Sequence, residues 1–350
     1  MKGSPGRSLW PLLVVLTVAA AMSGCSAPQG TARATPTGGS AAQSPSPSTT
    51  PPAARRAPVG DGAVLAWDST HRQLVAYVNL ASAVAPAKVA TWDGAWHEHP
   101  DARGPGLAGV LVDAPPLHGV VLVTVELGAQ FDVGGSNTWL WDGAQWSTLP
   151  IGNFTPCVGS PASGAWDAVH SQVVVVMAGQ CRNAGGFPPS ETWLFDGRAW
   201  RRAGVVPAGV VRPSLAWDVT ANHVVMLQAD PAVGLREWSW TGQAWAPVGA
   251  PDKGAPQPTQ LGGAGFDATA GGVVALPASG PPFASVVKEG MWSTLNTTTF
   301  PQRVVALTGD STNHRVLVLG EAPVPVNSTP DALATSDFLM TWSGHTWDVL

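Results

Sequence analysis

The chain has 350 residues, among them 40 Gly, 33 Pro, 17 Trp and 3 Cys. Charged residues make up 12% of it, against about 25% in an average soluble domain. Three cysteines exclude a disulfide-dense scaffold and a four-cysteine metal cluster, and a single Tyr excludes chemistry that needs two tyrosines. The high Gly and Pro content predicts many turns. The 17 tryptophans are the most unusual feature of the composition.

The first 24 residues predict an export signal. Lys2 and Arg7 give a positive start, and residues 9–22 form an apolar run that is too short for a transmembrane helix. Small residues then precede Cys25. This pattern resembles a bacterial lipoprotein signal, which implies that Cys25 becomes the lipidated first residue of the mature protein. The alternative is ordinary secretion with cleavage elsewhere and an unmodified cysteine.

Residues 25–58 predict a disordered tether. They are dominated by Ser, Thr, Pro, Ala and Gly and contain no aromatic residue, so they cannot bury enough apolar surface to fold. Such a tether holds the following domain away from a membrane. The five basic residues before residue 59 have no acidic counterpart, which leaves residues 59–350 with 13 basic and 23 acidic residues, a net charge of −10. This charge argues against nucleic-acid binding, which depends on Lys and Arg.

One pattern occurs six times within residues 59–350. Each copy has an aromatic or small residue before an Asp, an apolar run rich in Val, a third segment that carries Thr-Trp in most copies, a turn and a final Trp. The final Trp occurs at positions 96, 146, 200, 245, 292 and 347, and the first Asp at positions 68, 113, 167, 218, 267 and 310. Sixteen of the seventeen tryptophans fall at repeat positions, which indicates a repeat protein.

Each copy predicts four short strands. The Val-rich run is typical of a strand buried on both faces, and alternate Trp residues indicate a strand of period two. Asp-Gly after the third strand predicts a two-residue hairpin turn, and the Asp that ends the first strand is suited to accept N–H groups of the following turn. Four strands in about 49 residues predict an all-β, six-bladed β-propeller with four-stranded antiparallel blades.

The repeat resembles the bacterial kelch-like, galactose-oxidase-central-domain type of propeller over residues 59–350. The resemblance rests on the apolar second strand, the aromatic third strand and the Trp of the fourth. It departs at the Gly-Gly that kelch repeats usually carry after the second strand, where the first copy has Asn79-Leu80. No strand is left over to complete a blade from both chain ends. We therefore expect the ring to close by apolar packing of blade one on blade six, without a blade of mixed origin.

Cys157 and Cys181 are predicted to lie on one face of the propeller, because loops between blades and loops between second and third strands share that face. An exported protein meets an oxidising compartment, so we expect a disulfide between them. The alternative is two free thiols. Five histidines recur at one repeat position, three to five residues after the strand-one Asp, which predicts a structural role in that turn: His71, His118, His170, His223 and His314.

The densest polar cluster supplies the candidate ligand-binding residues, which are His97, His99, Asp101 and Arg103. His97 and His99 project to the same side of an extended strand, a spacing that can chelate a metal, although a third ligand has to come from elsewhere. The alternative is a solvated strand end, so we assign no metal and no cofactor. Tyr77 is the only tyrosine, which excludes the copper-radical chemistry of galactose oxidase.

The sequence therefore predicts a lipid-anchored, extracytoplasmic protein at the cell membrane that binds an envelope protein or a glycan. The alternatives are an envelope polysaccharide hydrolase or lyase with acidic or His groups at the mouth of the central channel, and a structural spacer without a ligand. The predicted binding surface is the loop-rich face of the propeller. It comprises residues 97–110, 150–163, 201–214 and 246–263, with 127–137, 179–191, 228–236 and 320–337.

Overall fold

The computed structural model describes residues 56–78, 87–102, 107–127, 133–151, 162–177, 190–230, 234–249, 260–278, 284–288, 290–325 and 337–350. The chain divides into two units, Met1–Thr49 and Thr50–Leu350, and all described residues belong to the second. The expected signal, Cys25 and nearly all of the tether lie outside the described residues. No helix in the described part of the chain is long and apolar enough to cross a membrane.

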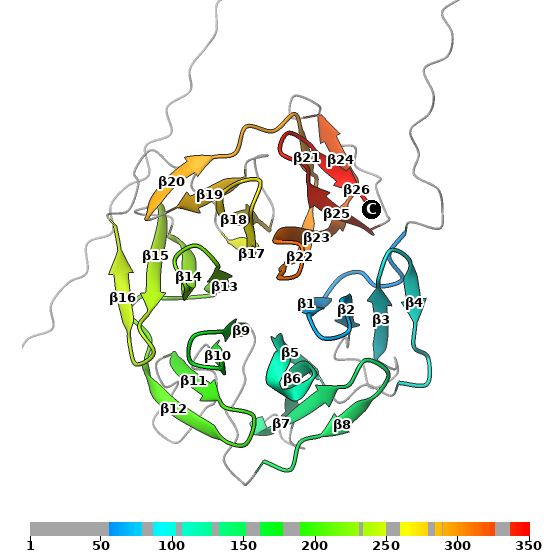
Figure 1. The fold of residues 1–350 in the computed structure, drawn as a ribbon, viewed down its shortest axis with the longest axis vertical. Helices are drawn as coiled ribbons and strands as arrows, with labels where there is room; N and C mark the ends of the chain where they lie inside the picture. The colour runs from blue at the N-terminus through cyan, green and yellow to red at the C-terminus, as the bar shows by residue number, and fades with distance from the viewer. Residues whose placement is uncertain are drawn as a thin grey trace, which may run out of the picture. The chain divides into compact units, whose positions relative to one another are not determined.

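The described chain forms six four-stranded antiparallel sheets, which are the six blades of a β-propeller. In each blade the strands follow one another in chain order, and the first strands lie nearest the centre of the ring (Figure 1). The all-β, six-bladed fold predicted from the repeat is confirmed. One 3-10 helix, η2 (Pro115–Leu117), is the only helical element that the described residues form.

The strands of blades one to three are β1 (Val64–Asp68), β2 (Gln73–Val78), β3 (Lys88–Trp92) and β4 (Trp96–Glu98), then β5 (Leu107–Ala114), β6 (Gly119–Leu127), β7 (Val133–Trp141) and β8 (Trp146–Thr148), then β9 (Ala162–Asp167), β10 (Gln172–Met177), β11 (Glu191–Phe195) and β12 (Trp200–Val205). Those of blades four to six are β13 (Ser214–Asp218), β14 (His223–Asp230), β15 (Gly234–Trp240) and β16 (Trp245–Val248), then β17 (Leu261–Asp267), β18 (Gly272–Pro277), β19 (Ser285–Lys288) and β20 (Met291–Thr294), then β22 (Val304–Asp310), β23 (Arg315–Glu321), β25 (Asp337–Trp342) and β26 (Trp347–Val349). An additional two-stranded sheet, which the repeat did not predict, pairs β21 (Thr299–Pro301) with β24 (Pro323–Pro325).

The Val-rich second strands form the middle of the core. β10 and β18 are buried along their whole length, because each sheet packs between two neighbouring blades. The buried apolar residues separate into six clusters, one at each interface between neighbouring blades. The core of this protein is therefore a ring of six interfaces around the central axis.

In five of the six blades the loop between the third and fourth strands is longer than the predicted two-residue turn, whereas in blade five Lys288 pairs with Met291 and two residues lie between them. In blade two, Trp141 pairs with Trp146, so four residues stand between the closing pair, and blades three, four and six have the same loop length. Asp142 begins this loop, and its Oδ1 accepts the N–H groups two and three residues later at 3.0 and 2.9 Å. Gly143 supplies a positive φ of 97°. These side-chain contacts stabilise the longer loop.

The ring closes between blade six and blade one without a blade of mixed origin, as expected. Leu65 and Trp67 of blade one pack with Leu317 and Leu339 of blade six in one apolar cluster. The last strand, β26, pairs with β25 of its own blade.

Polar contacts add to this closure. Arg303, at the start of blade six, forms ion pairs with Asp61, with Glu321 at 3.1 Å and with Asp337 at 2.9 Å. Residues 56–57 also contact the start of β25 through a β-bridge and one backbone hydrogen bond. The prediction of purely apolar closure missed this ion cluster, because its members lie far apart in the sequence and follow no repeat.

Candidate binding sites of the propeller

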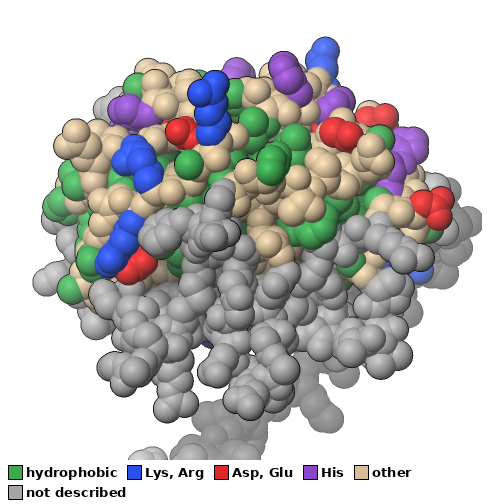
Figure 2. Space-filling model, turned by 90° about the horizontal axis from the view of Figure 1, so that it is seen from below, with side chains coloured by type: hydrophobic (Ala, Val, Ile, Leu, Met, Phe, Trp, Pro, Cys, Tyr) green, Lys and Arg blue, Asp and Glu red, His purple; other side chains and the backbone are tan. Residues whose placement is uncertain are grey.

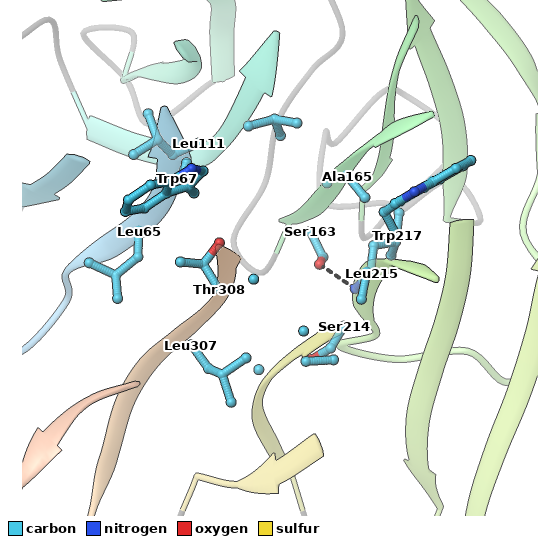
Figure 3. A pocket seen from close by; sticks show the side chains of 18 of the residues that line it. Leu65, Trp67, Leu111, Ser163, Ala165, Ser214, Leu215, Trp217, Leu307 and Thr308 are labelled. Atoms are coloured by element: carbon cyan, nitrogen blue, oxygen red, sulfur yellow. Dashed lines mark hydrogen bonds between the residues drawn. The ribbon is translucent and has the colours of Figure 1, made fainter. Parts of the chain in front are cut away.

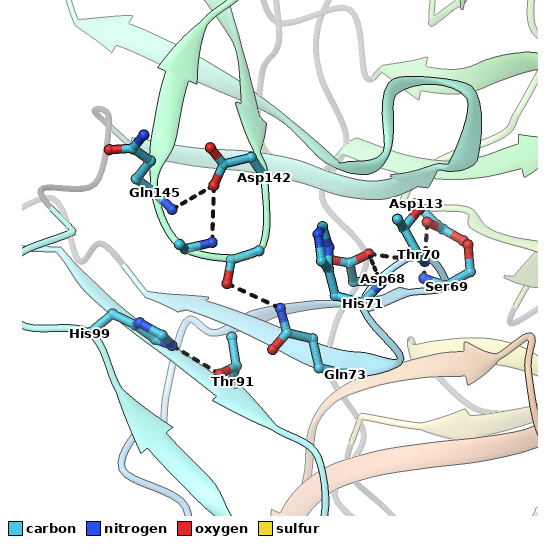
Figure 4. A network of polar contacts seen from close by, with 12 residues as sticks. Asp68, Ser69, Thr70, His71, Gln73, Thr91, His99, Asp113, Asp142 and Gln145 are labelled. Carbon is cyan, nitrogen blue, oxygen red and sulfur yellow. Dashed lines mark hydrogen bonds and ion pairs between the residues drawn. The ribbon is translucent and has the colours of Figure 1, made fainter.

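In five of the six blades, the Asp that ends the first strand accepts backbone N–H groups of the turn to the second strand. In blade one, Asp68 Oδ1 accepts the backbone N–H groups of Thr70 and His71 at 3.2 and 3.0 Å (Figure 4). This confirms the predicted role of the Asp. The same two contacts, from residues two and three positions later, occur at Asp218, Asp267 and Asp310.

The turn histidines do not share one repeat position, which corrects the sequence interpretation. His71 and His170 stand three residues after the Asp, and Nδ1 of each lies 2.7 Å from the second carboxylate oxygen of that Asp. His118 and His314 occupy the next turn position, and His223 comes one residue later. That next position has a positive φ in each blade and holds Arg72, His118, Ser171, Asn222, Gly271 and His314.

The histidines of these turns help to pack neighbouring blades. A Cβ added to Gly143 would lie 2.7 Å from the ring of His71, and one added to Gly242 would lie 2.5 Å from the ring of His170. These glycines therefore leave room for an imidazole of the preceding blade. The predicted structural role of the turn histidines agrees with these contacts, and Figure 2 shows His side chains along one rim of the propeller.

The two histidines of the cluster predicted to bind a ligand contact different residues. His97 Nε2 lies 2.9 Å from Asp93 Oδ1, whereas His99 Nε2 lies 2.9 Å from Thr91 Oγ1. The His99 ring also makes an edge contact with Trp141 of blade two, and burial lowers its pKa. No three His, Cys, Asp or Glu side chains in the described part of the chain are placed to hold a metal ion. The ligand-binding role stays a prediction for all four residues, His97, His99, Asp101 and Arg103, the last of which lies outside the described residues.

The loop-rich face predicted as the binding surface lies largely outside the described residues. The same holds for Cys157 and Cys181. Both the surface and the disulfide therefore stay predictions, and the sites that can be described lie in the body of the propeller.

A cavity of 550 Å³, the central channel, lies inside the ring of first strands (Figure 3). Leucines from several blades line it, including Leu65, Leu111 and Leu307. Ser163 lines it too, and its hydroxyl accepts the N–H of Leu215 at 2.8 Å. Aromatic residues that stand one position before the strand-ending Asp complete the wall, namely Trp67, Trp166, Trp217 and Phe266.

Two carboxylates line the central channel, and their surroundings differ. Asp310 accepts four hydrogen bonds, two from its turn, one from the Asn313 amide and one from Arg315 at 3.0 Å. Asp113 of blade two lacks such a set, and burial raises its pKa to about 7. The enzyme alternative predicts acidic or His groups at the mouth of the channel, and the described lining residues include Asp113, Asp310 and His314.

The final Trp of a repeat joins two blades. Trp200 Nε1 donates to Thr138 Oγ1 of the preceding blade at 2.8 Å, and Trp245 Nε1 donates to Thr192 Oγ1 at the same distance. Both threonines stand four residues before the first residue of the hairpin loop in their blade. The repeat thus contains an indole–hydroxyl bond between blades.

Blade four replaces this threonine by Glu237, and a cavity opens there. By the repeat, its counterpart in blade five is Trp292, and both residues line the cavity, which has a volume of 170 Å³. We call this cavity the interblade pocket. It is lined by Leu235, Arg236, Glu237, Trp238, Pro247, Val248, Gly249 and Trp292.

The polar groups of the interblade pocket have unused hydrogen-bonding capacity. Glu237 is 6% exposed, and its Oε2 has no hydrogen-bond partner among the described residues. Burial, together with the charge of Asp218, raises the pKa of Glu237 to about 7. Arg236 Nε is likewise buried without a partner in the described chain, while Nη2 lies 3.0 Å from Asp230. The Glu237 carboxylate and the Trp292 indole therefore border one small cavity, whose lining also includes Arg236 and Trp238.

The sequence analysis missed this pocket, although the sequence contained a signal for it. The equivalent positions of the six third strands hold Val89, Thr138, Thr192, Glu237, Ser285 and Leu339. Glu237 is the one ionisable residue in that set. A repeat shows what the blades have in common, whereas this pocket lies where blade four differs from the others.

The fold is similar to that of solved lectins. The SapL1 lectin in complex with alpha methyl fucoside matches with a TM-score of 0.54 and 16% identity over 84% of this chain and 96% of that chain. The fucose-specific lectin from Aleuria aurantia matches with a TM-score of 0.53 and 15% identity over 82% and 93%. AofleA from Arthrobotrys oligospora has a TM-score of 0.54 and 16% identity over 82% and 85%. At these identities the likeness shows the propeller fold alone.

No family model and no curated protein matches the sequence.

Proposed function

We propose that this protein binds carbohydrate and that the interblade pocket is its sugar site. The observation that carries the proposal is the buried Glu237 carboxylate, which has an unpartnered oxygen in a cavity bordered by the Trp292 indole. A buried polar group without a hydrogen bond costs stability, so its place here is explained if a ligand supplies the missing donor. At the two preceding blade interfaces the final Trp provides such a donor, as Trp200 does for Thr138 and Trp245 does for Thr192.

A sugar ring offers the groups that this pocket lacks. Its hydroxyls donate charge-assisted hydrogen bonds to Glu237 Oε2, and its oxygens accept from Arg236 Nε. Its C–H face packs on the apolar surface of Trp292. A cavity of 170 Å³ suits a single ring, because pockets for drug-sized ligands have about 300–1,000 Å³.

The lectin neighbours support a carbohydrate-binding scaffold. The SapL1 structure contains alpha methyl fucoside, and the Aleuria aurantia protein is named as fucose-specific. The present chain has the same six-bladed architecture, which makes a methyl fucoside the first sugar to test.

Calorimetric titration with alpha methyl fucoside and the methyl glycosides of galactose, glucose and mannose tests the sugar site. We expect saturable binding of at least one glycoside. Glu237→Gln should weaken it by about tenfold or more, because a charge-assisted hydrogen bond is lost. Trp292→Ala should remove most of it, because the stacking surface is lost.

Glu191→Gln is the matched control. Glu191 is a third-strand carboxylate of blade three that pairs with Arg202 at 2.6 Å and lies outside the interblade pocket. Its replacement should leave the affinity unchanged. A glycoside that binds wild type, Glu237→Gln and Trp292→Ala equally, or no binding of any glycoside, would contradict the proposed site.

We also propose that Cys25 carries a lipid anchor and that the propeller works outside the cytoplasm, tethered to the cell membrane by residues 25–58. The signal-like segment before Cys25 and the composition of the tether support this proposal. Such a tether would let the interblade pocket reach glycans of the envelope. Three further predictions also stay proposals. They are an envelope protein as partner, the Cys157–Cys181 disulfide and the kelch-like family of the repeat.

Cell fractionation tests the anchor. Cys25→Ser should move the protein from the detergent-extracted membrane fraction to the soluble fraction, because the lipidated thiol is lost. Cys157→Ser keeps the anchor and is the control. Unchanged membrane association of Cys25→Ser would show that the anchor is not at this cysteine.

A further inference from the structure

The turn after β5 supplies no backbone N–H group to Asp113, unlike the corresponding turns of blades four to six. In blades four to six, the Asp that ends the first strand accepts the N–H groups of the residues two and three positions later. Asp113 stands one register position earlier than those Asp residues, because it pairs with Val120 as Trp67 pairs with Leu74. The residues two and three positions after it are Pro115 and Pro116, which have no N–H. Ser69 of blade one donates its backbone N–H instead, at 3.3 Å (Figure 4).

Asp113 lines the central channel together with Ser69 and Pro115. We call this part of the cavity the turn end of the channel, because the turns between first and second strands form it. Burial raises the pKa of Asp113 to about 7, and the negative charge of Asp68 adds to this effect. Asp68 itself accepts hydrogen bonds from its own turn and contacts His71. Asp113 accepts hydrogen bonds from Ser69 and Ala114 but, unlike Asp310, has no Arg partner among the described residues.

An aromatic layer adjoins this carboxylate. In four blades the residue before the strand-ending Asp is aromatic and lines the channel, whereas the same register position holds Asp113 itself in blade two and Gly309 in blade six. Aromatic side chains next to a carboxylate favour an organic cation, since ring faces attract positive charge and the rings cover its apolar part. The four residues of the aromatic layer are Trp67, Trp166, Trp217 and Phe266.

We propose that the turn end of the central channel binds an organic ammonium ion, with Asp113 as its counter-ion and the aromatic layer around its apolar substituent. Asp310 adds a second negative group to the lining, and His314 is the titratable base beside it. The net charge of −10 over residues 59–350 attracts cations to the domain. The channel volume of 550 Å³ accommodates a small organic molecule. This site shares no residue with the interblade pocket and does not rest on the carbohydrate proposal.

Calorimetry with hexylammonium chloride, and with hexan-1-ol as its uncharged match, tests the ammonium site. At about pH 8 the Asp113 carboxyl is mostly ionised, so we expect hexylammonium to bind saturably and more tightly than hexanol. Asp113→Asn should weaken hexylammonium binding by about tenfold or more, since the counter-ion is lost, and should leave hexanol unaffected. Asp196→Asn, which changes an exposed hairpin carboxylate outside the channel, should alter neither.

The comparison of the two probes on the wild-type protein decides the question even if Asp113→Asn fails to fold. Hexylammonium that binds no better than hexanol, or does not bind at all, would overturn the proposal. Equal affinity of wild type and folded Asp113→Asn would also overturn it, because the channel would then act as an apolar cavity without a counter-ion.

Discussion

Two carboxyl groups in this propeller lie where burial opposes their ionisation. Burial raises the pKa of Asp113 and of Glu237 to about 7, well above the value of about 4 for an exposed carboxyl. Between these values the folded state holds protons that the unfolded state has released. The contribution of these two groups to the free energy of unfolding therefore falls as pH rises from about 4 to about 7.

Replacing both groups by amides should flatten this dependence. We expect wild type to lose up to about 5 kcal/mol more stability than Asp113→Asn/Glu237→Gln between about pH 5 and pH 8, measured by urea unfolding. Other ionisable groups contribute equally to both proteins, so the difference isolates the two carboxyls. Parallel pH profiles would show that neither carboxyl is protonated in the folded state.

At the residue scale, the sequence predicted the shared positions better than the exceptions. The strand-ending Asp was assigned to its turn because six copies show it. Asp113 and Glu237 matter for the opposite reason, since each stands where one blade differs from the rest. The Pro-Pro after Asp113 was visible in the sequence, but its effect required the hydrogen bonds of the other turns to be known.

At the scale of strands, the final tryptophans of the repeats have two roles: some hold neighbouring blades together, and Trp292 lines the interblade pocket. Trp200 is 4% exposed, stacks on Phe195 at 4.9 Å and donates to Thr138. Trp292 is half-buried and borders the interblade pocket.

Alanine substitutions should separate the two kinds of tryptophan. We expect Trp200→Ala to cost about 3–5 kcal/mol in unfolding free energy, because it opens a cavity and breaks a hydrogen bond. Trp292→Ala should cost about half as much or less, since part of its ring already contacts solvent. The measurement is chemical unfolding of both variants. An equal loss would show that Trp292 is also a packing residue and would weaken the case for the interblade pocket.

The strand pattern itself was predictable, and its limits have a physical cause. Period-two alternation and buried Val runs depend on neighbours within a blade, so they are visible in sequence. The predicted length of the hairpin loops was wrong, because Asp-Gly occurs in hairpin loops of several lengths. The hydrogen bonds that Asp142 accepts stabilise the four-residue loop. The pairing of β21 with β24 joins segments that belong to no repeat position.

At the scale of the whole ring, the seam between blades six and one combines apolar packing with an ion cluster around Arg303. Arg303→Ala should lower the unfolding free energy by about 1–2 kcal/mol, because three carboxylates lose their cation, and high salt should shrink the difference. Arg202→Ala, which breaks a single ion pair with Glu191, is the control and should cost less. A loss for Arg303→Ala no greater than for Arg202→Ala would mean that apolar packing alone closes the ring.

Two segments that are far apart in the sequence, around Arg56 and around Leu350, both contact strand β25. Phe338 of β25 forms a bridge with Arg56, and the carbonyl of the next residue, Leu339, accepts the N–H of Leu350 at 2.9 Å. The propeller is thus cyclic in space, although the chain that builds it is linear. A short covalent link between these two points, with new ends opened between any other two blades, would keep every blade intact. Each blade is also a complete unit of consecutive strands, so the natural step by which such a ring grows or shrinks is the gain or loss of one whole blade.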